Sequence, residues 1–193
     1  MTDAIKVLFT ETLSQAWGRL DRVSFEQIRR DGVTQRHAFE VYDHGNAAAM
    51  LLVDPSRDTV MLTRQFRLGA HINGDPSFLL EACAGLLDGD APEACAIREA
   101  EEETGYRPRN VRHVTDVYVS PGSLTEKVSC FIGEYTEADR VSDGGGLEHE
   151  GEDIELVELA FPAALTMIKA GLIVDAKTIV LLQHLALERA GLA

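Results

Sequence analysis

The sequence is poor in cysteine, proline and tryptophan, and each shortage narrows the class of protein. Its 193 residues include three cysteines, six prolines and one tryptophan. Because Cys83, Cys95 and Cys130 are odd in number and lack metal-type spacing, we expect no disulfide framework and place the thiols as buried hydrophobes in a reducing cytosol. The first ten residues contain only a short apolar run, which predicts neither a secretory signal nor a membrane span. We therefore expect a cytoplasmic protein.

Positive charge is also scarce. The chain has 18 Lys and Arg residues against 32 Asp and Glu, which gives a formal net charge of −14. Nucleic acids and anionic membranes are bound by clustered cations, so neither is expected as a partner. With 45% hydrophobic residues and this length, the chain suits one buried core with an appendage, whereas two full domains would be cramped.

What the chain does have is acid concentrated on one face of an expected helix. Glu99, Glu102 and Glu103 lie at positions i, i+3 and i+4. Like charges at that spacing destabilise a helix by roughly 0.2–0.5 kcal/mol per pair, and negative charge at a helix C-terminus opposes the macrodipole. A hard divalent cation over the carboxylates explains both features, and an acidic surface helix with accidental spacing is the alternative. Arg98 is expected to pair with Glu102 and to orient it.

The flanks of this segment predict the ends of the helix. Asp90 is a candidate N-cap, Pro92 suits the first turn, and Glu93 completes a capping box, so the helix should begin near Ala91. Gly105 supplies the left-handed residue that ends it. The three carboxylates therefore lie in the last two turns.

Alternating hydrophobic residues and turn residues predict the remaining elements. A small β appendage has expected strands at residues 5–13, 19–28 and 36–42, with a hairpin turn at Asp31 and Gly32. The main part has expected strands at residues 47–53, 59–66, 79–84, 111–120, 127–135 and 155–158, and helices at 161–170 and 176–189. We expect an α/β fold with a mixed sheet between helices, divided into an N-terminal β appendage at residues 1–45 and a main domain at 46–193.

Residues 85–106 resemble the signature of the Nudix hydrolases, in which Gly, five residues, Glu and seven residues precede Arg-Glu-U-x-Glu-Glu-x-Gly-U, with U apolar. Four residues here separate Gly85 from Asp90, and residues 98–106 fill the second half of the pattern. The departures are one residue fewer and Asp in place of Glu, at a position that is usually structural. Further segments resemble the nucleoside-diphosphate-sugar pyrophosphatase branch, most of all its GDP-mannose group with the ADP-ribose group nearby: residues 40–46, 64–67, 81–87, 120–122, 125–126, 144–146 and 152–155.

The resemblance implies the Nudix α/β/α sandwich and hydrolysis of the pyrophosphate bond of a nucleoside diphosphate sugar, with GDP-mannose favoured. The products would be a nucleoside monophosphate and a sugar 1-phosphate. ADP-ribose hydrolysis and a non-catalytic nucleotide-binding Nudix module are the alternatives. The cofactor implied is Mg²⁺, with Mn²⁺ as a substitute, because Mg²⁺ binds a few carboxylates together with substrate phosphates.

The resemblance also implies the site residues. The metal ligands would be the backbone carbonyl of Ala84 and the side chains of Glu99, Glu102, Glu103 and Glu152. Glu152 would act as catalytic base, with Glu103, Glu102 and Arg98 completing the catalytic set. Glu152 belongs to a long loop between residues 135 and 154, in which Gly144, Gly145 and Gly146 favour a hinged lid. For Glu148 and Glu150 in that loop we prefer a solvated acidic surface.

Substrate contacts implied by the resemblance are Trp17, Glu40, Arg67, Ala84, Glu126 and Lys177. The guanidinium of Arg67 suits phosphate, and an indole suits stacking on a base. A packed core indole is the alternative for Trp17, a strand-edge charge for nearby Arg64, and surface charges for the others. The GDP-mannose group carries basic residues where this chain has Ala38 and Phe39, which leaves the preferred base and sugar open. Members of this branch swap the N-terminal segment to form homodimers, so a homodimer is expected.

Overall fold

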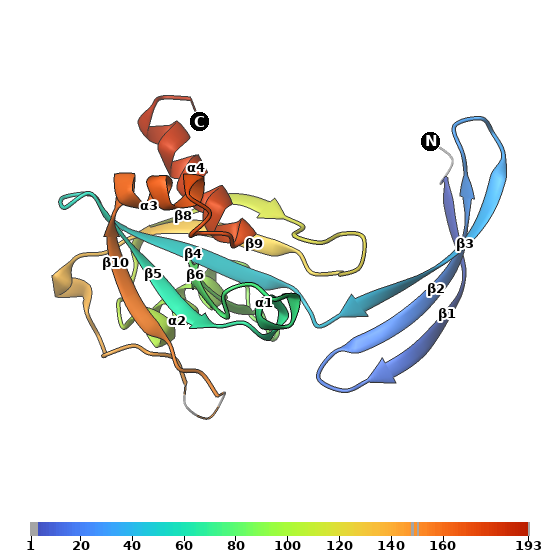
Figure 1. The fold of residues 1–193 in the computed structure, drawn as a ribbon, viewed down its shortest axis with the longest axis horizontal. Helices are drawn as coiled ribbons and strands as arrows, with labels where there is room; N and C mark the ends of the chain where they lie inside the picture. Colours follow the sequence, from blue (N-terminus) through green and yellow to red (C-terminus); the bar gives the residue numbers. More distant parts are fainter. Residues whose placement is uncertain (1–3, 148, 150, 193) are drawn as a thin grey trace. The chain divides into compact units, whose positions relative to one another are not determined.

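The chain divides into two compact units (Figure 1). The computed structural model describes residues 4–147, 149 and 151–192. One unit comprises the chain up to Asn46 together with Tyr118–Lys127, and the other comprises Ala47–Val117 and Val128–Ala193. The first unit therefore gathers residues from two separate parts of the sequence.

The first unit is a three-stranded antiparallel sheet of β1 (Ile5–Gln15), β2 (Arg19–Ile28) and β3 (Thr34–Asp43). The turn between β2 and β3 is the predicted one: Gly32 has a φ of +83°, and the amide of Val33 donates to Oδ1 of Asp31 at 3.1 Å. The segment 118–127 joins the sheet at Tyr42, whose amide donates to the carbonyl of Ser123 at 2.8 Å. The expected β appendage is thus present, with this loop added to it.

The second unit contains a seven-stranded mixed sheet flanked by helices. Its central order is β10-β5-β4-β9-β8, with β6 paired to β5 and β7 paired to β4. The strands are β4 (Ala47–Asp54), β5 (Thr59–Phe66), β6 (Phe78–Glu81), β7 (Cys83–Leu86), β8 (Arg109–Val117), β9 (Val128–Glu134) and β10 (Glu155–Ala160), and the helices are α1 (Leu68–Asn73), α2 (Pro92–Thr104), α3 (Phe161–Lys169) and α4 (Ala176–Arg189). A short 3-10 helix, η1, spans Glu137–Asp139. Among the described strands of this sheet, β4 and β9 pair in parallel and the other pairs are antiparallel, which makes the sheet mixed.

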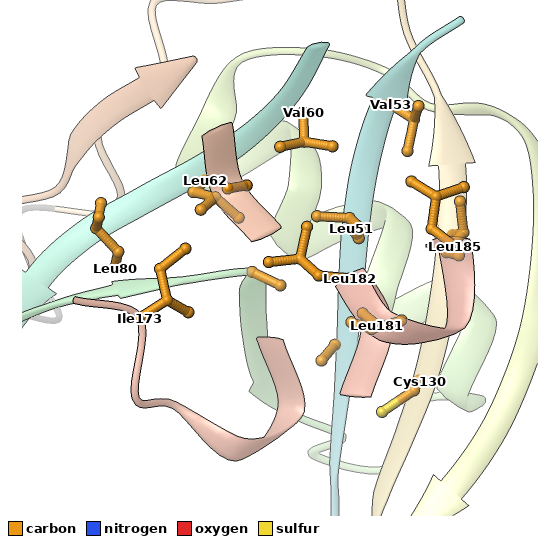
Figure 2. Packing of buried hydrophobic residues seen from close by; sticks show 14 of the residues in the cluster. Leu51, Val53, Val60, Leu62, Leu80, Cys130, Ile173, Leu181, Leu182 and Leu185 are labelled. Atoms are coloured by element: carbon orange, nitrogen blue, oxygen red, sulfur yellow. The ribbon is translucent and has the colours of Figure 1, made fainter. Parts of the chain in front are cut away.

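Strand β4 shows why the fold is a sandwich, since every one of its residues is buried. Successive side chains of a strand point to opposite faces. Leu51 and its alternate neighbours pack with Leu181 and Leu182 of α4 (Figure 2), whereas Met50 and its alternate neighbours pack with Cys95 and other residues of α2. The sheet is therefore covered by α2 on one face and by α3 and α4 on the other (Figure 1). The expected α/β class with a mixed sheet between helices is confirmed.

The prediction that Asp90 caps α2 was wrong. The N-cap is Ala91, which makes no side-chain cap, and Pro92 is the first helical residue. The amide of Asp90 closes a turn on the carbonyl of Leu87 at 2.7 Å, and its carboxylate faces Nε of Arg98 at 3.6 Å. Turn formation and this ion pair therefore hold the carboxylate away from the helix end. The other end is as predicted, because Gly105 is left-handed with a φ of +78°.

Other elements also differ from the sequence predictions; the strand expected at residues 111–120, for example, spans Arg109–Val117. Helix α1 lies where no element was expected, and the single strand expected at residues 79–84 is two strands separated at Ala82. The amide of Ala82 leaves the sheet and donates to Oγ1 of Thr178 on α4 at 2.7 Å. None of the described helices combines the length and the apolar character that a membrane crossing requires.

Candidate active site

The carboxylate of Glu99 lies directly against the backbone of Gly85 in β7. A Cβ placed on Gly85 would come within 2.1 Å of Oε1 of Glu99, so only glycine leaves room for this carboxylate. Glu99 is 9% exposed. Burial raises the pKa of Glu99 to about 7, against the opposing charge of Arg98 and with help from the negative charges of Glu102 and Glu152. Strand β7 and helix α2 thus hold a partly desolvated acid between them.

Arg98 organises the outer side of this group. Its Nη2 lies 2.9 Å from Oε1 of Glu99, and its Nη1 lies 2.8 Å from Oε2 of Glu102. The predicted pair between Arg98 and Glu102 is therefore present. Because a planar guanidinium fixes the direction of each carboxylate it binds, Arg98 orients both acids at once.

Glu103 is the most deeply buried acid of the group. It is 1% exposed, and among the described residues its Oε2 has no hydrogen-bond partner. Burial, together with the negative charges of Glu99 and Glu152, raises the pKa of Glu103 to about 8, and the charges of Arg67 and Lys177 oppose the rise. Leaving a buried carboxylate oxygen without a partner costs free energy, so some ligand is expected to satisfy it.

Glu152 approaches the same acids from the loop before β10. Its Oε2 accepts a hydrogen bond from the amide of Leu147 at 2.9 Å, and its charge acts on both Glu99 and Glu103. Glu148 and Glu150, also discussed above, lie outside the described residues. The structure therefore places Glu152 with the helix carboxylates, although it is about fifty positions away in the sequence.

The three glycines of this loop dock on the end of α2. Gly145 donates to the carbonyl of Glu103 at 2.8 Å, and Gly146 donates to the carbonyl of Glu102 at 3.1 Å. All three glycines have positive φ, and a Cβ on Gly146 would lie 2.5 Å from Oε2 of Glu152. The sequence suggested a hinge, whereas the glycines observed here permit close packing and satisfy carbonyl groups that a helix end leaves free.

The residues of this group fit a hard divalent cation. All candidate side-chain donors are carboxylate oxygens, and among the described residues one of them is buried without a partner. Burial and neighbouring carboxylates raise the pKa of Glu99 and of Glu103. In the described part of the chain, no three His, Cys, Asp or Glu side chains are drawn together around a single point. Ala84, whose carbonyl was the fifth predicted ligand, lies in β7 opposite Ala49 of β4.

A second cluster, of alternating charge, lies beside Glu103. Nε and Nη2 of Arg67 donate to the two oxygens of Glu81 at 2.7 and 2.9 Å, and the ammonium of Lys177 also donates to Glu81. Glu81 is 2% exposed. Burial alone would raise the pKa of Glu81, but the hydrogen bonds from Arg67 and the charge of Lys177 hold it below its ordinary value. The charge of Glu103 in turn acts on Arg67.

The remaining predicted substrate residues belong to the first unit. Trp17 is 73% exposed, so the alternative of a packed core indole is wrong for this unit; its ring stacks on His44 with centroids 5.1 Å apart. Glu40 accepts a hydrogen bond from Arg22 at 2.9 Å, and Glu126 lies half-buried in the segment 118–127. Arg64 of the second unit pairs with Glu155 on the neighbouring strand at 3.0 Å, which makes it a strand-edge charge.

Sequence reasoning missed Glu81 and Asp175 as members of the site. Asp175 caps α4 by accepting from the amide of Thr178, and its Oδ1 lies 2.9 Å from the ammonium of Lys177. A signal was available for Glu81, because it is the only charged residue in the apolar run 78–84. A carboxylate in a buried strand is stable only when it is paired.

Comparison with known proteins defines the class of this chain. The model of the NUDIX domain matches residues 43–179, so the chain belongs to the Nudix family. Nudix hydrolases generally need divalent metal ions, in agreement with the donor set described above. The expectation of a Nudix hydrolase is confirmed.

Within the Nudix family, the matched relatives share one name, GDP-mannose pyrophosphatase. The model of the N-terminal domain of the GDP-mannose pyrophosphatase NudK matches residues 4–42. The chain is 46% identical to the GDP-mannose pyrophosphatase of Cronobacter sakazakii over 185 residues, which cover 95% of this chain and 96% of the relative. It is likewise 46% identical to a GDP-mannose pyrophosphatase of Escherichia coli over 189 residues, covering 97% and 98%. The resemblance to this branch is confirmed.

A solved structure described as an ADP compounds hydrolase has the same fold. Its TM-score is 0.75, at 19% sequence identity, and the match covers 99% of this chain and 98% of that one. At this identity the likeness establishes the shared fold alone.

Proposed function

We propose that this chain hydrolyses the pyrophosphate bond of a nucleoside diphosphate sugar, with GDP-mannose as the favoured substrate and Mg²⁺ as the cofactor. The products are a nucleoside monophosphate and a sugar 1-phosphate. Two matches support the substrate: the N-terminal model of a GDP-mannose pyrophosphatase on residues 4–42, and 46% identity to enzymes of that name over nearly the whole chain.

One observation carries the proposal of a metal-dependent reaction. Oε2 of Glu103 is buried without a partner among the described residues, and the charges of Glu99 and Glu152 act on the same carboxylate. A purely structural role would leave this arrangement unexplained, because an unpaired buried acid destabilises the fold. A divalent cation offsets that cost by neutralising the acids and satisfying the free oxygen.

In this proposal Glu99, Glu102, Glu103, Glu152 and the carbonyl of Ala84 hold the metal. When bound, the ion supplies neutralising charge to the phosphates and lowers the pKa of a coordinated water. Mg²⁺ is favoured because it binds a few carboxylates together with phosphates, and Mn²⁺ is the expected substitute. Arg98 contributes by keeping Glu99 and Glu102 in one orientation.

The other residues bind the substrate and activate water. Glu152 accepts the proton of the attacking water, for which its position before β10 and its proximity to Glu99 and Glu103 are the support. Arg67 binds the diphosphate, whose charge a guanidinium matches well. Trp17 offers an exposed flat face to the base, and Glu40, Glu126 and Lys177 are proposed as further contacts.

A coupled phosphate-release assay tests this function. Purified protein is incubated with GDP-mannose in the presence of Mg²⁺, of Mn²⁺ or of a chelator; the protein is then removed by filtration, excess Zn²⁺ and Mg²⁺ are added, and alkaline phosphatase releases phosphate from the products. Intact GDP-mannose has no phosphomonoester group, so the phosphatase cannot act on it before the pyrophosphate bond is cleaved. Phosphate should therefore appear only when the protein was incubated with a divalent metal. Absence of turnover on GDP-mannose, ADP-ribose and other nucleotide sugars would instead favour a nucleotide-binding module.

A matched pair of variants separates the metal site from general charge on α2. Glu103→Gln should retain the fold and lower kcat by at least about a hundredfold, because a positioned charge at the reacting phosphates is lost. Glu101→Gln removes the same charge from the same helix, but Glu101 is occupied by Arg107, which donates to it at 2.7 and 3.1 Å. Equal losses in the two variants would contradict the proposed role of Glu103.

The substrate itself is decided by a side-by-side comparison. Under the proposal kcat/KM is higher for GDP-mannose than for ADP-ribose. The opposite order would reassign the chain to ADP-ribose hydrolysis. This is the second candidate because Ala38 and Phe39 stand where the GDP-mannose group carries basic residues. The family assignment and the metal site would survive that outcome.

We also propose a homodimer formed through residues 1–45, and a location in the cytoplasm. Support for the dimer comes from large apolar side chains exposed on the first unit, among them Val7, Phe9 and Phe39 at 59%, 62% and 53%. A three-stranded sheet needs a covered apolar face to be stable. Light scattering after size-exclusion chromatography should give twice the chain mass, and a monomer at micromolar concentration would contradict the proposal. Three free, buried cysteines suit the reducing compartment.

A further inference from the structure

Four charged side chains in the second unit form a row of charges of alternating sign: Asp175, Lys177, Glu81 and Arg67. The ammonium of Lys177 contacts both Asp175, at 2.9 Å, and Glu81. Glu81 then receives Nε and Nη2 of Arg67 on its two oxygens. The two inner charges of this row, Lys177 and Glu81, therefore have partners of opposite sign, which is the condition under which buried ions are tolerated.

The four members differ in how far they reach solvent. The side chains of Glu81, Lys177 and Asp175 are 2%, 13% and 17% exposed, whereas that of Arg67 is 41% exposed. Arg67 uses its Nε and Nη2 edge for Glu81, so among the described residues its Nη1 edge is the one left for another anion. Arg67 is thus the end of this row of charges at which a ligand can arrive.

The buried end of this row of charges is anchored to the sheet. Oγ1 of Thr178 accepts from the amide of Ala82 at 2.7 Å and donates to Oδ2 of Asp175 at 2.6 Å. Ala82 directly follows Glu81 in the sequence. The N-terminus of α4 and the junction of β6 with β7 therefore form one hydrogen-bonded unit, and the carboxylate of Glu81 has a fixed position within it.

We propose that Glu81 is a positioning residue: it clamps one edge of Arg67 so that the other edge is presented to the diphosphate of the substrate. The inference rests on the proposed function, because it takes the ligand of Arg67 from there. A long, flexible side chain loses rotamer entropy when it binds, and a clamp removes that cost beforehand. Lys177 also helps to hold Glu81 in place, since its ammonium contacts both Asp175 and Glu81.

A double-mutant cycle of Glu81→Gln and Arg67→Ala tests this inference. The readouts are the Kd of GDP-mannose by calorimetry in a chelating buffer, where no turnover occurs, and KM and kcat with Mg²⁺. Each single variant should weaken binding and raise KM by about tenfold, with kcat within about threefold because Glu99, Glu102 and Glu103 are untouched. In the double variant the second substitution should add less than about twofold, because Glu81 acts only through Arg67.

Two further variants keep the test decisive. If Glu81→Gln fails to fold, Glu81→Asp keeps the buried negative charge but shortens the side chain by one methylene, which withdraws the carboxylate from Arg67. The same rise in KM is expected. Glu155→Gln is the matched control, since it removes a carboxylate from an arginine on the same sheet, and it should leave Kd and KM unchanged.

The outcomes separate this inference from the proposed function. Additive losses in the double variant, or unchanged binding by Glu81→Gln, would overturn the positioning role. Native protein that binds GDP-mannose without hydrolysing it would overturn the proposed reaction while the binding cycle still tests Glu81. Native protein that neither binds nor hydrolyses GDP-mannose in the presence of Mg²⁺ would overturn both.

Discussion

Glu103 should make the metal-free protein less stable as pH rises, and the effect is large enough to measure. Burial, with the charges of Glu99 and Glu152, raises its pKa from 4.5 to about 8. As pH increases above 4.5, the unfolded chain loses this proton while the folded chain still holds it, so the unfolded state is favoured progressively. The loss of stability continues to about pH 8 and then levels off. At the plateau it amounts to about 5 kcal/mol, a large fraction of the stability of a typical domain.

The variant Glu103→Gln removes this titration and keeps the shape of the side chain. In a chelating buffer it should be nearly as stable as the native protein near pH 4.5, and more stable above pH 8 by up to about 5 kcal/mol. For a chain of this size that corresponds to a rise in Tm on the order of 10 °C. A substitution that abolishes metal-dependent activity is therefore expected to stabilise the metal-free protein at alkaline pH.

Urea unfolding followed by circular dichroism measures this directly, at several pH values and one protein concentration, because a dimer's apparent stability depends on concentration. Glu101→Gln is the control: its carboxylate is paired with Arg107, and its effect should not grow between pH 5.5 and 8.5. A native-to-variant difference for Glu103→Gln that stays constant with pH, or a variant less stable near pH 8.5, would refute the view that this acid is buried and unpaired.

Two other substitutions and a metal-dependent thermal melt test the rest of the site. Glu152→Gln should lower kcat by about a hundredfold or more with the Kd of GDP-mannose within about twofold; unchanged turnover would assign the base to another loop carboxylate. Gly85→Ala should weaken Mg²⁺ binding by at least about tenfold, since the new methyl group meets the carboxylate of Glu99, whereas Gly69→Ala, with open space around it, should have no effect in the same titration. Mg²⁺ at about a hundred times its Kd should stabilise the native protein by about 2.7 kcal/mol in thermal melts, and an equal shift in Glu103→Gln would contradict the ligand assignment.

Much of the fold follows from local patterns in the sequence. The strands Arg19–Ile28 and Thr59–Phe66 and the helix Ala176–Arg189 have the predicted bounds, because alternation, apolar periodicity and flanking turn residues mark their ends. Helix α1 escaped prediction for a physical reason. It has six residues, none of them buried, so it has no apolar face that a periodic pattern could reveal.

Long-range contacts explain the other differences. The break between β6 and β7 depends on the hydrogen bond from Ala82 to Thr178, which joins residues 96 positions apart. The role of Gly85 as a seat for Glu99 depends on how β7 packs against α2. Neither is encoded in a local pattern, whereas the helical spacing of Glu99, Glu102 and Glu103, and the pairing of Arg98 with Glu102, are local and were predicted.

Direct measurement of Mn²⁺ binding tests the central claim, that the acids at the end of α2 hold a divalent metal. Electron paramagnetic resonance of free Mn²⁺, titrated with native protein in the absence of nucleotide, gives the number of bound ions and their affinity. The account predicts saturable binding by the native protein and by Glu101→Gln, displacement by Mg²⁺, and loss of the site in Glu103→Gln. Undiminished Mn²⁺ binding by Glu103→Gln would contradict it.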